Sequence, residues 1–345
     1  MRQLNVLAID LAKTKFQVCK RTPGGQIVYN KMVSRAKLTE LLATEKPSLV
    51  AMESCGGTHH WARYAKAQGH QVKAMSARKV KAFLQGHKTD ANDAEAIAIA
   101  ATQPQVKACR LLSKDEQCQQ SILRIRELLV HQKVASTKQL RDLLLELNYP
   151  IPVGDSALNQ AVPEILEEAE NGLSSDFRAV LSEQWQHIKV LWRRLEEVER
   201  RLTHQASTDV ICQRLQQLEG VGPVNAMSLK TVLNASEHFK NSRQAAACIG
   251  VTPVQHSSGG KERMGAISRL PGHKKLRSTL YEGAMAVIRQ LAKREARTVK
   301  EQWLQQLIAR RGKKVAAIAL ANKTVRTAYA MLKNNTDYQP VMLAA

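Results

Sequence analysis

Two short apolar runs near the start of the chain each end in a carboxylate. The run at residues 4–9 is followed by Asp10, and the run at residues 48–52 is followed by Glu53. Apolar runs of this length are typical of buried strands. Because open α/β sheets gather their ligands at the carboxyl ends of strands, we expect both carboxylates to lie at the same edge of a sheet. The pattern therefore predicts an α/β domain with an acidic site at that edge.

A second pair of acids opens an alanine-rich run. Asp90 and Asp93 are three residues apart in the segment KTDANDA, residues 88–94. Alanine favours helix, and a spacing of three places both carboxylates on one helix face. Acidic residues in a first turn are also favoured by the helix dipole, so N-terminal capping of a solvated helix is the alternative interpretation.

Together these four acids predict a divalent metal site. Two strands and a helix can bring Asp10, Glu53, Asp90 and Asp93 to one point. Four carboxylates a few ångströms apart cannot all stay ionised without cations, and oxygen ligands with retained waters are what Mg²⁺ prefers. Such a constellation is typical of two-metal phosphodiester chemistry, with the metals roughly 4 Å apart.

The first hundred residues alternate short strands with helices. Strands are predicted at residues 4–10, 16–21, 26–33, 48–53 and 71–75, and helices at 35–45, 58–68 and 78–85. Gly24-Gly25 predicts a hairpin turn, so three antiparallel strands precede the crossover units. This order is the ribonuclease H arrangement, in which acids on the first and fourth strands become neighbours.

From about residue 113 the pattern changes to long helical periodicity. Leucines between Leu123 and Leu147 predict one or two helices that end near residues 148–150. An acidic connector at residues 155–170 is expected next, and then apolar residues from Leu181 to Leu202 recur at fours and threes. Such a stripe buries against another helix of the same chain or of a second subunit. We favour a helical hairpin that also helps dimerisation.

The segment LEGVGP, residues 218–223, predicts a helix end at Gly220 and a new helix after Pro223. It resembles a helix-hairpin-helix, in which glycines such as Gly220 and Gly222 let backbone N–H groups approach a phosphate. An ordinary tight turn between two helices is the alternative interpretation.

A glycine- and hydroxyl-rich segment, TPVQHSSGGK at residues 252–261, is expected to form no regular element. The adjacent glycines would give the hydroxyl of an exposed serine, Ser257 or Ser258, room to approach a phosphorus atom. A flexible turn is the alternative interpretation.

The chain of 345 residues has a formal net charge of +22 and a pI near 9.9, which indicates a polyanionic partner such as nucleic acid, with an anionic membrane as the rival. Residues 261–314 contain fifteen Lys or Arg and four Glu, a net charge of +11. A phosphate-binding surface is predicted there, although a solvated basic face is equally plausible for Lys261 and Arg263. Its candidate contacts are Lys261, Arg263, Arg269, Lys274, Lys275 and Arg277.

No run of eighteen apolar residues occurs, and the chain starts directly with a predicted strand, so we expect a cytosolic protein that does not enter a membrane. The six cysteines form no CxxC pair, which argues against a zinc site and a disulfide framework.

These motifs together resemble the DEDD transposases, the bridge-RNA-guided recombinases of the insertion sequence 110 and 1111 group, with Piv-type DNA invertases as relatives. The matching segments are IDLAK (9–13), MESCGG (52–57), KTDANDA (88–94), GVGP (220–223), GVTP (250–253), SSGG (257–260), GH (272–273) and LR (276–277). Each segment alone is weak, but their order and spacing over roughly residues 4–335 is highly specific.

The resemblance implies three regions. Residues 1–112 would form a RuvC-like domain in which Asp10, Glu53, Asp90 and Asp93 bind Mg²⁺. Residues 113–208 would form a helical coiled coil, and residues 209–345 a mainly α transposase domain with a helix-hairpin-helix-like element and a nucleophilic serine. The family serine falls on Ser258, but the segment RLPG at 269–272 departs from the usual basic pattern, so Ser257 stays a candidate.

The resemblance also implies the reaction and the partners. The serine would form a covalent phosphoserine link to a cut DNA strand, and the acidic site of one subunit would complete the serine site of another. Strand exchange would pass through a Holliday junction, with donor and target DNA chosen by a structured bridge RNA. A homodimer that assembles to a tetramer, acting at the nucleoid in the bacterial cytoplasm, is expected.

Two rival functions remain open from the residues alone. A Holliday-junction nuclease on the same fold would use water as the nucleophile, with the serine segment only binding backbone. A non-catalytic nucleic-acid-binding protein would keep the four acids as a structural relic.

Overall fold

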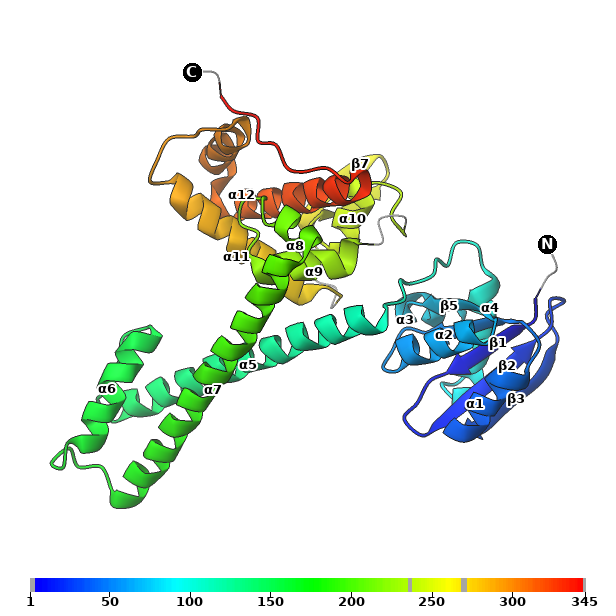
Figure 1. Cartoon of the computed structure of the whole chain (residues 1–345), viewed down its shortest axis with the longest axis horizontal. Coiled ribbons are helices and arrows are strands. Elements are labelled where there is room, and N and C mark those ends of the chain that lie inside the picture. Colours follow the sequence, from blue (N-terminus) through cyan, green and yellow to red (C-terminus); the bar gives the residue numbers. More distant parts are fainter. Residues whose placement is uncertain (1–3, 235–237, 268–271, 344–345) are drawn as a thin grey trace. The chain divides into compact units, whose positions relative to one another are not determined.

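A computed structural model of the protein describes residues 4–234, 238–267 and 272–343. The chain divides into two compact units, Met1–Gln117 (unit 1) and Cys118–Ala345 (unit 2). Unit 1 is the blue to cyan part of Figure 1, and unit 2 runs from cyan to red.

Unit 1 is built on one mixed sheet. Its elements are β1 (Val6–Asp10), β2 (Lys15–Arg21), β3 (Ile27–Ser34), α1 (Arg35–Thr44), β4 (Leu49–Glu53), α2 (Thr58–Ala67), β5 (Gln71–Met75), α3 (Ala77–Val80), the 3-10 helix η1 (Lys81–Phe83) and α4 (Asp90–Thr102). The strand order is β3-β2-β1-β4-β5, with β1 antiparallel to β2 and parallel to β4. The predicted strands and the predicted adjacency of the first and fourth strands are confirmed.

Helices cover both faces of this sheet. On one face, α1 and α2 place Leu38 and Trp61 against strand residues such as Ile9. On the other face, the alanine-rich α4 packs closely through Ala94 and Ile97, because its small side chains let the helix approach the strands. The sheet therefore fixes the start of α4 next to the carboxyl ends of β1 and β4.

Unit 2 is mostly helical. Its elements are α5 (Lys114–Glu146), which begins in unit 1, α6 (Asp155–Glu167), α7 (Ser175–Thr208), α8 (Val210–Leu215), α9 (Pro223–Leu233), α10 (Ser242–Ile249), β6 (Pro253–Ser258), β7 (Lys261–Ile267), α11 (Lys274–Leu291) and α12 (Val299–Asn334). A backbone break at Gly312 divides α12 into two helices. Across the described ranges, none of the helices combines the length and apolar character needed to span a bilayer.

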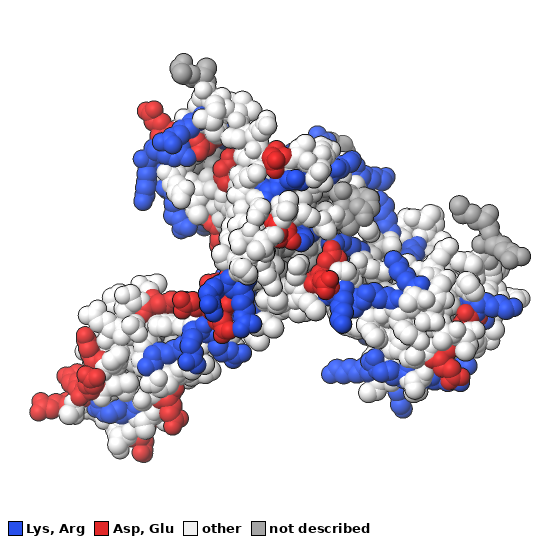
Figure 2. Space-filling view, in the orientation of Figure 1, with Lys and Arg blue, Asp and Glu red and all other residues white. Residues whose placement is uncertain are grey.

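The two long helices α5 and α7 form the predicted helical hairpin. Leu129 packs against Leu191 and Leu195, and Arg126 donates to the Glu199 carboxylate. The acidic connector expected between them is present, and most of it forms the helix α6, because Leu158, Val162 and Ile165 give that segment an apolar face. Residues 155–176 carry six acidic residues and no Lys or Arg, and Figure 2 shows acidic side chains gathered at this end of the hairpin.

The segment at residues 252–261 was expected to be irregular, and this prediction is wrong. It contains β6 and the start of β7, which pair as an antiparallel hairpin. The turn is Gly259-Gly260, with φ values of +56° and +76°. A two-residue hairpin loop whose residues both have positive φ matches the twist of the flanking strands, which is why two glycines close this turn.

Candidate active site

The carboxyl ends of β1 and β4 place two of the predicted acids side by side. These strands are parallel neighbours in which Ile9 pairs with Met52, so Asp10 and Glu53 occupy the next position of each strand. The chain after Glu53 is held by Thr58, whose hydroxyl donates to the Glu53 carbonyl at 2.9 Å. The same hydroxyl accepts from the Cys55 N–H at 2.8 Å.

The other two acids lie in the first turn of α4. Thr89 caps the helix by accepting from the Asn92 N–H at 3.2 Å. The amide of Asn30 on β3 donates to the Ala91 carbonyl at 2.9 Å and accepts from Gln17 at 2.8 Å. These bonds tie the start of α4 to the sheet, and so they fix where Asp90 and Asp93 can lie.

All four acids line one cavity of about 610 Å³. Asp10, Glu53 and Asp93 are half-buried, and Asp90 is exposed. The structure therefore brings Asp10, Glu53, Asp90 and Asp93 to the lining of one cavity, and their role as metal ligands stays a prediction.

Three basic side chains that sequence reasoning did not assign to the site line the same cavity. Arg78 lies on α3, Lys81 on η1 and Lys88 just before α4. The sequence does contain a basic segment directly after β5, the strand next to β4, and this segment could have indicated that cations lie near Glu53. A cavity with acids and cations together can bind a metal ion and a phosphate at once.

The acids of the cavity repel one another. Burial, followed by the charges of Asp93 and Asp90, raises the pKa of Asp10 above its usual value. Burial and the charges of Asp10 and Asp93 likewise raise the pKa of Glu53. Lys88 acts in the opposite direction on both carboxyl groups. The site therefore carries an excess of negative charge that a cation would relieve.

The donor chemistry fits a hard divalent cation, since the four acids offer only oxygen ligands from three converging elements. In the part of the chain that the structure describes, no three His, Cys, Asp or Glu side chains already lie close enough together to hold one ion. Ligation would therefore require the carboxylates to turn toward a common point.

The two candidate serines lie on opposite faces of the β6–β7 hairpin. Ser258 pairs with Lys261 and His256 pairs with Arg263, so these four residues share one face, since directly opposed residues project to the same side. Ser257 pairs with Glu262 and shares the other face. Both serines are exposed. Ser258 therefore has cationic neighbours, whereas Ser257 has an anionic one.

The helix before this turn, α8, ends at Leu215 and not at Gly220 as predicted, whereas α9 begins at Pro223, close to the predicted start. Gly220 has a φ of +76°, and a Cβ added there would lie 2.7 Å from the Gly283 carbonyl oxygen of α11. A Cβ added at Gly222 would have no neighbour within 4 Å. Close packing against α11 thus explains Gly220, and Gly222 is left open to the surface.

The predicted phosphate contacts differ in their placement. Lys274 is exposed and Lys275 is half-buried, whereas Arg277 is buried and donates to the carbonyl of Ile249 at 2.9 Å and to that of Gly272. These bonds give Arg277 a structural role. Arg269 lies outside the described residues.

Sequence similarity extends across both units. Residues 212–300 match the transposase IS116/IS110/IS902 family, and residues 7–149 match the DEDD transposases of IS110 type. The chain belongs to the IS110 family of transposases. This IS110-family transposase is therefore a DNA-processing enzyme of an insertion sequence.

Similar proteins span the transposase almost completely. It is 36% identical to a probable family 20 transposase of Pseudomonas aeruginosa, over 98% of this chain and 99% of that protein. It is 33% identical to the transposase for insertion sequence element IS1111A of Coxiella burnetii, over 98% and 92% of the two chains. The transposase for IS1328 of Yersinia enterocolitica is also 33% identical, over 98% and 99%.

Proposed function

We propose that this transposase cuts and rejoins DNA by metal-assisted transesterification, with Ser258 as the nucleophile. The observation that carries the proposal is the convergence of four carboxylates from β1, β4 and α4 on one cavity that also holds Arg78, Lys81 and Lys88. The strand order of unit 1, an antiparallel meander followed by parallel crossovers, supports a RuvC-like, ribonuclease H-like domain.

Asp10, Glu53, Asp90 and Asp93 would hold Mg²⁺. The bound ion would supply Lewis-acid stabilisation of charge on the attacking and leaving oxygens. Arg78, Lys81 and Lys88 would bind the nonbridging oxygens of the scissile phosphate and orient it, because these cations line the same cavity as the acids.

Ser258 would attack the phosphorus atom through Oγ. A phosphoserine ester would form as the Oγ proton passes to water, the bond from phosphorus to the leaving strand would break, and that strand would depart with a hydroxyl end after its oxygen takes up a proton from water. The ester conserves the phosphodiester bond energy, so rejoining needs no ATP. Ser258 is favoured over Ser257 because it shares a hairpin face with Lys261 and Arg263, which attract a phosphate, whereas Glu262 beside Ser257 repels one.

The proposed partners are donor and target DNA and a structured bridge RNA that selects them. The acids lie in unit 1 and the serines in unit 2, and the family resemblance implies that one subunit completes the site of another. A dimer through the long helices is supported by exposed apolar side chains on α5, including Leu128 and Val134, which are 56% and 58% exposed. We retain the division into a catalytic region (1–112), a helical coiled coil (113–208) and a transposase region (209–345), with two dimers forming a tetramer.

An adduct assay tests the reaction. The full-length protein is incubated with Mg²⁺ and an end-labelled junction that carries the cognate element ends, and the products are separated under denaturing conditions. We expect a protein–DNA adduct that is lost in Ser258→Ala, kept in Ser257→Ala and lost in Asp90→Asn. Adduct loss in Ser257→Ala alone would move the nucleophile to Ser257. Cut strands without any adduct would show hydrolysis, and no reaction by the parent protein would favour a non-catalytic binding role.

A further inference from the structure

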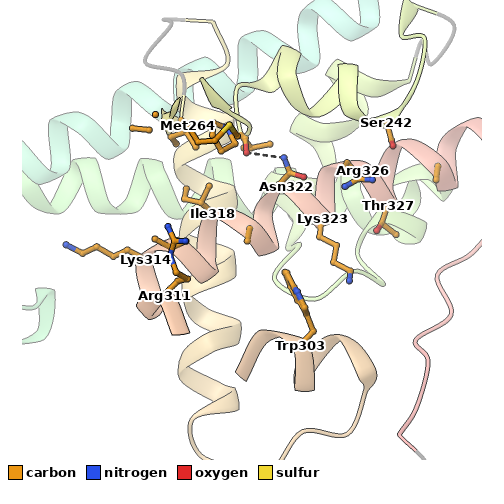
Figure 3. A pocket seen from close by; sticks show the side chains of 18 residues that line it. Ser242, Met264, Trp303, Arg311, Lys314, Ile318, Asn322, Lys323, Arg326 and Thr327 are labelled. Carbon is orange, nitrogen blue, oxygen red and sulfur yellow. Dashed lines mark hydrogen bonds between the residues drawn. The ribbon is translucent and has the colours of Figure 1, made fainter. Parts of the chain in front are cut away.

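Unit 2 contains a second large cavity, a groove of about 1070 Å³ between the β6–β7 hairpin and the second part of α12 (Figure 3). Met264 and Ile267 of β7 form one wall. Ile318 and Ala319 of α12 form the floor. No part of the proposed reaction uses this groove.

Cations surround the groove. Arg311, Lys314, Lys323 and Arg326 belong to its lining, and no Asp or Glu does. All four side chains are exposed. Arg311 and Lys314 flank the backbone break at Gly312, which separates the two parts of α12. An apolar floor with a wholly cationic rim is complementary to a ligand that has apolar faces and an anionic backbone.

The groove also contains an aromatic ring and a side-chain amide, the two groups on which a nucleobase stacks and to which it hydrogen-bonds. Trp303 lines the groove, and the Lys323 ammonium lies 4.6 Å from the centre of its ring (Figure 3). Asn322 donates to the Val251 carbonyl at 3.1 Å, which fixes its amide in the lining. Bases stack on aromatic rings and hydrogen-bond to amides, whereas the phosphates between them need Lys or Arg.

We propose that this groove binds an unpaired stretch of a DNA strand, with its bases against Ile318, Ala319 and Trp303 and its phosphates on the cations of the rim. DNA is the expected occupant because the chain is a transposase and the groove adjoins the hairpin that carries Ser257 and Ser258. Unpaired nucleotides are required because bases in a duplex are stacked and cannot turn into a side groove. The proposal needs only DNA binding by unit 2 and does not depend on Ser258.

The test is a binding measurement in EDTA, so that catalysis plays no part. The full-length protein is titrated by fluorescence anisotropy against a DNA duplex with a short central bulge and against the same duplex fully paired. We expect the bulged duplex to bind at least about tenfold more tightly, since the stacking of a single base on an aromatic ring supplies a gain of about this size. Ala319→Phe, which fills the groove, should abolish this preference, and Ser258→Ala should keep it.

Ala309→Phe is the control, because Ala309 is exposed on the first part of α12 and does not line the groove. The binding constant for the bulged duplex should fall with salt on a log–log plot. Lys323→Gln with Arg326→Gln should make that slope shallower by about 0.7 for each phosphate that the rim no longer neutralises. Lys138→Gln, at an exposed lysine of α5 outside both the lining and residues 261–314, should leave it unchanged.

Three results would overturn the proposal. Equal binding of bulged and paired DNA by the parent protein is the first, and an equal effect of Ala319→Phe and Ala309→Phe is the second. The third is a preference for the bulge only when it is made of RNA.

A second copy of the chain is the alternative occupant, since its acidic α6 end would suit the cationic rim. In that case Ala319→Phe would change the molar mass measured by light scattering and leave DNA binding intact. If no adduct forms but the bulged duplex still binds more tightly than the paired one, the proposed reaction is wrong and the groove proposal stands.

Discussion

Asp10 and Glu53 are held close to other carboxylates at an electrostatic cost. An acid whose pKa is raised on folding contributes full stability below its ordinary pKa, which is 3.8 for Asp10, and loses it as the pH rises through the raised value. At neutral pH the fold therefore bears the cost of the ionised group. Removing the charge should relieve that cost while abolishing the proposed metal ligand.

We therefore predict that Asp10→Asn raises the melting temperature in EDTA by about 4 °C, which corresponds to about 1 kcal/mol for a unit of 117 residues. Mg²⁺ should stabilise the parent protein and have a smaller effect on the variant. Glu40→Gln, at an exposed carboxylate of α1 paired with Lys37, serves as the control. A lower melting temperature for Asp10→Asn in EDTA would show that repulsion does not dominate at this residue.

Glu301 shows the opposite electrostatic behaviour. It is buried at the start of α12, where the Arg294 guanidinium and the Arg297 N–H hold its pKa down to about 2. The stability that this pair supplies is present above the ordinary pKa of 4.5 and is lost as the pH falls through about 2.

Glu301→Gln should therefore destabilise unit 2 by about 2 kcal/mol at pH 7, and the difference from the parent protein should shrink as the pH falls from about 5 toward 2. Urea unfolding followed by circular dichroism across this pH range measures it. A difference that stays constant with pH would show that the carboxylate charge is not what stabilises the site.

The turn between α8 and α9 has two glycines, Gly220 and Gly222, and either close packing or phosphate binding could explain each of them. Gly220→Ala should destabilise the protein by about 2–4 kcal/mol, because alanine disfavours a φ of +76° and its Cβ would meet the Gly283 carbonyl oxygen. Gly222→Ala should leave stability nearly unchanged. Thermal unfolding compares the two variants, and equal stability for both would remove the packing explanation. Weaker DNA binding by a stably folded Gly222→Ala would support the phosphate-binding turn.

Patterns that depend on neighbouring residues predicted the elements of unit 1 well. The alternation of apolar runs and turn glycines located all five strands, and the order of those strands implied that Asp10 and Glu53 become neighbours. Two elements of unit 2 were missed for different reasons. The β6–β7 hairpin is local in sequence, but its strands are exposed and lack the apolar alternation that marks a half-buried strand. The helix α6 depends on distant contacts, because three apolar residues among its acids pack on α5 and α7.

Burial explains the other differences. The charge run containing Arg277 is typical of solvated surface, but the carbonyls of Ile249 and Gly272 draw that guanidinium inside. Arg78, Lys81 and Lys88 showed no motif spacing, and only the folded connection between β5 and α4 brings them to the acids. Sequence alone could therefore indicate the acids that line the cavity and not the cations beside them.

Charge is distributed unevenly along the chain, with six acids at residues 155–176 and a net charge of +11 at residues 261–314. If the basic region contacts DNA, the observed binding constant should fall steeply with salt. Lys274→Gln with Lys275→Gln should flatten the log–log slope by about 0.9 for each phosphate that is no longer neutralised. The control is Lys138→Gln with Lys189→Gln, at exposed positions of α5 and α7.

Equal log–log slopes for the two double variants would show that the DNA does not contact Lys274 and Lys275. Arg277 is left unchanged because its removal would disturb the fold.

The proposed reaction requires that four carboxylates, distant in the sequence, bind divalent metal together. Calorimetric titration of the full-length protein with Mn²⁺ tests this requirement most directly, with Asp93→Asn compared against Glu95→Gln, a change on the same helix outside the cavity. We predict saturable Mn²⁺ binding that Asp93→Asn weakens by at least about tenfold, the equivalent of about 1.4 kcal/mol, and that Glu95→Gln leaves intact. Equal Mn²⁺ binding by the parent protein and Asp93→Asn, or none by the parent protein, would contradict it.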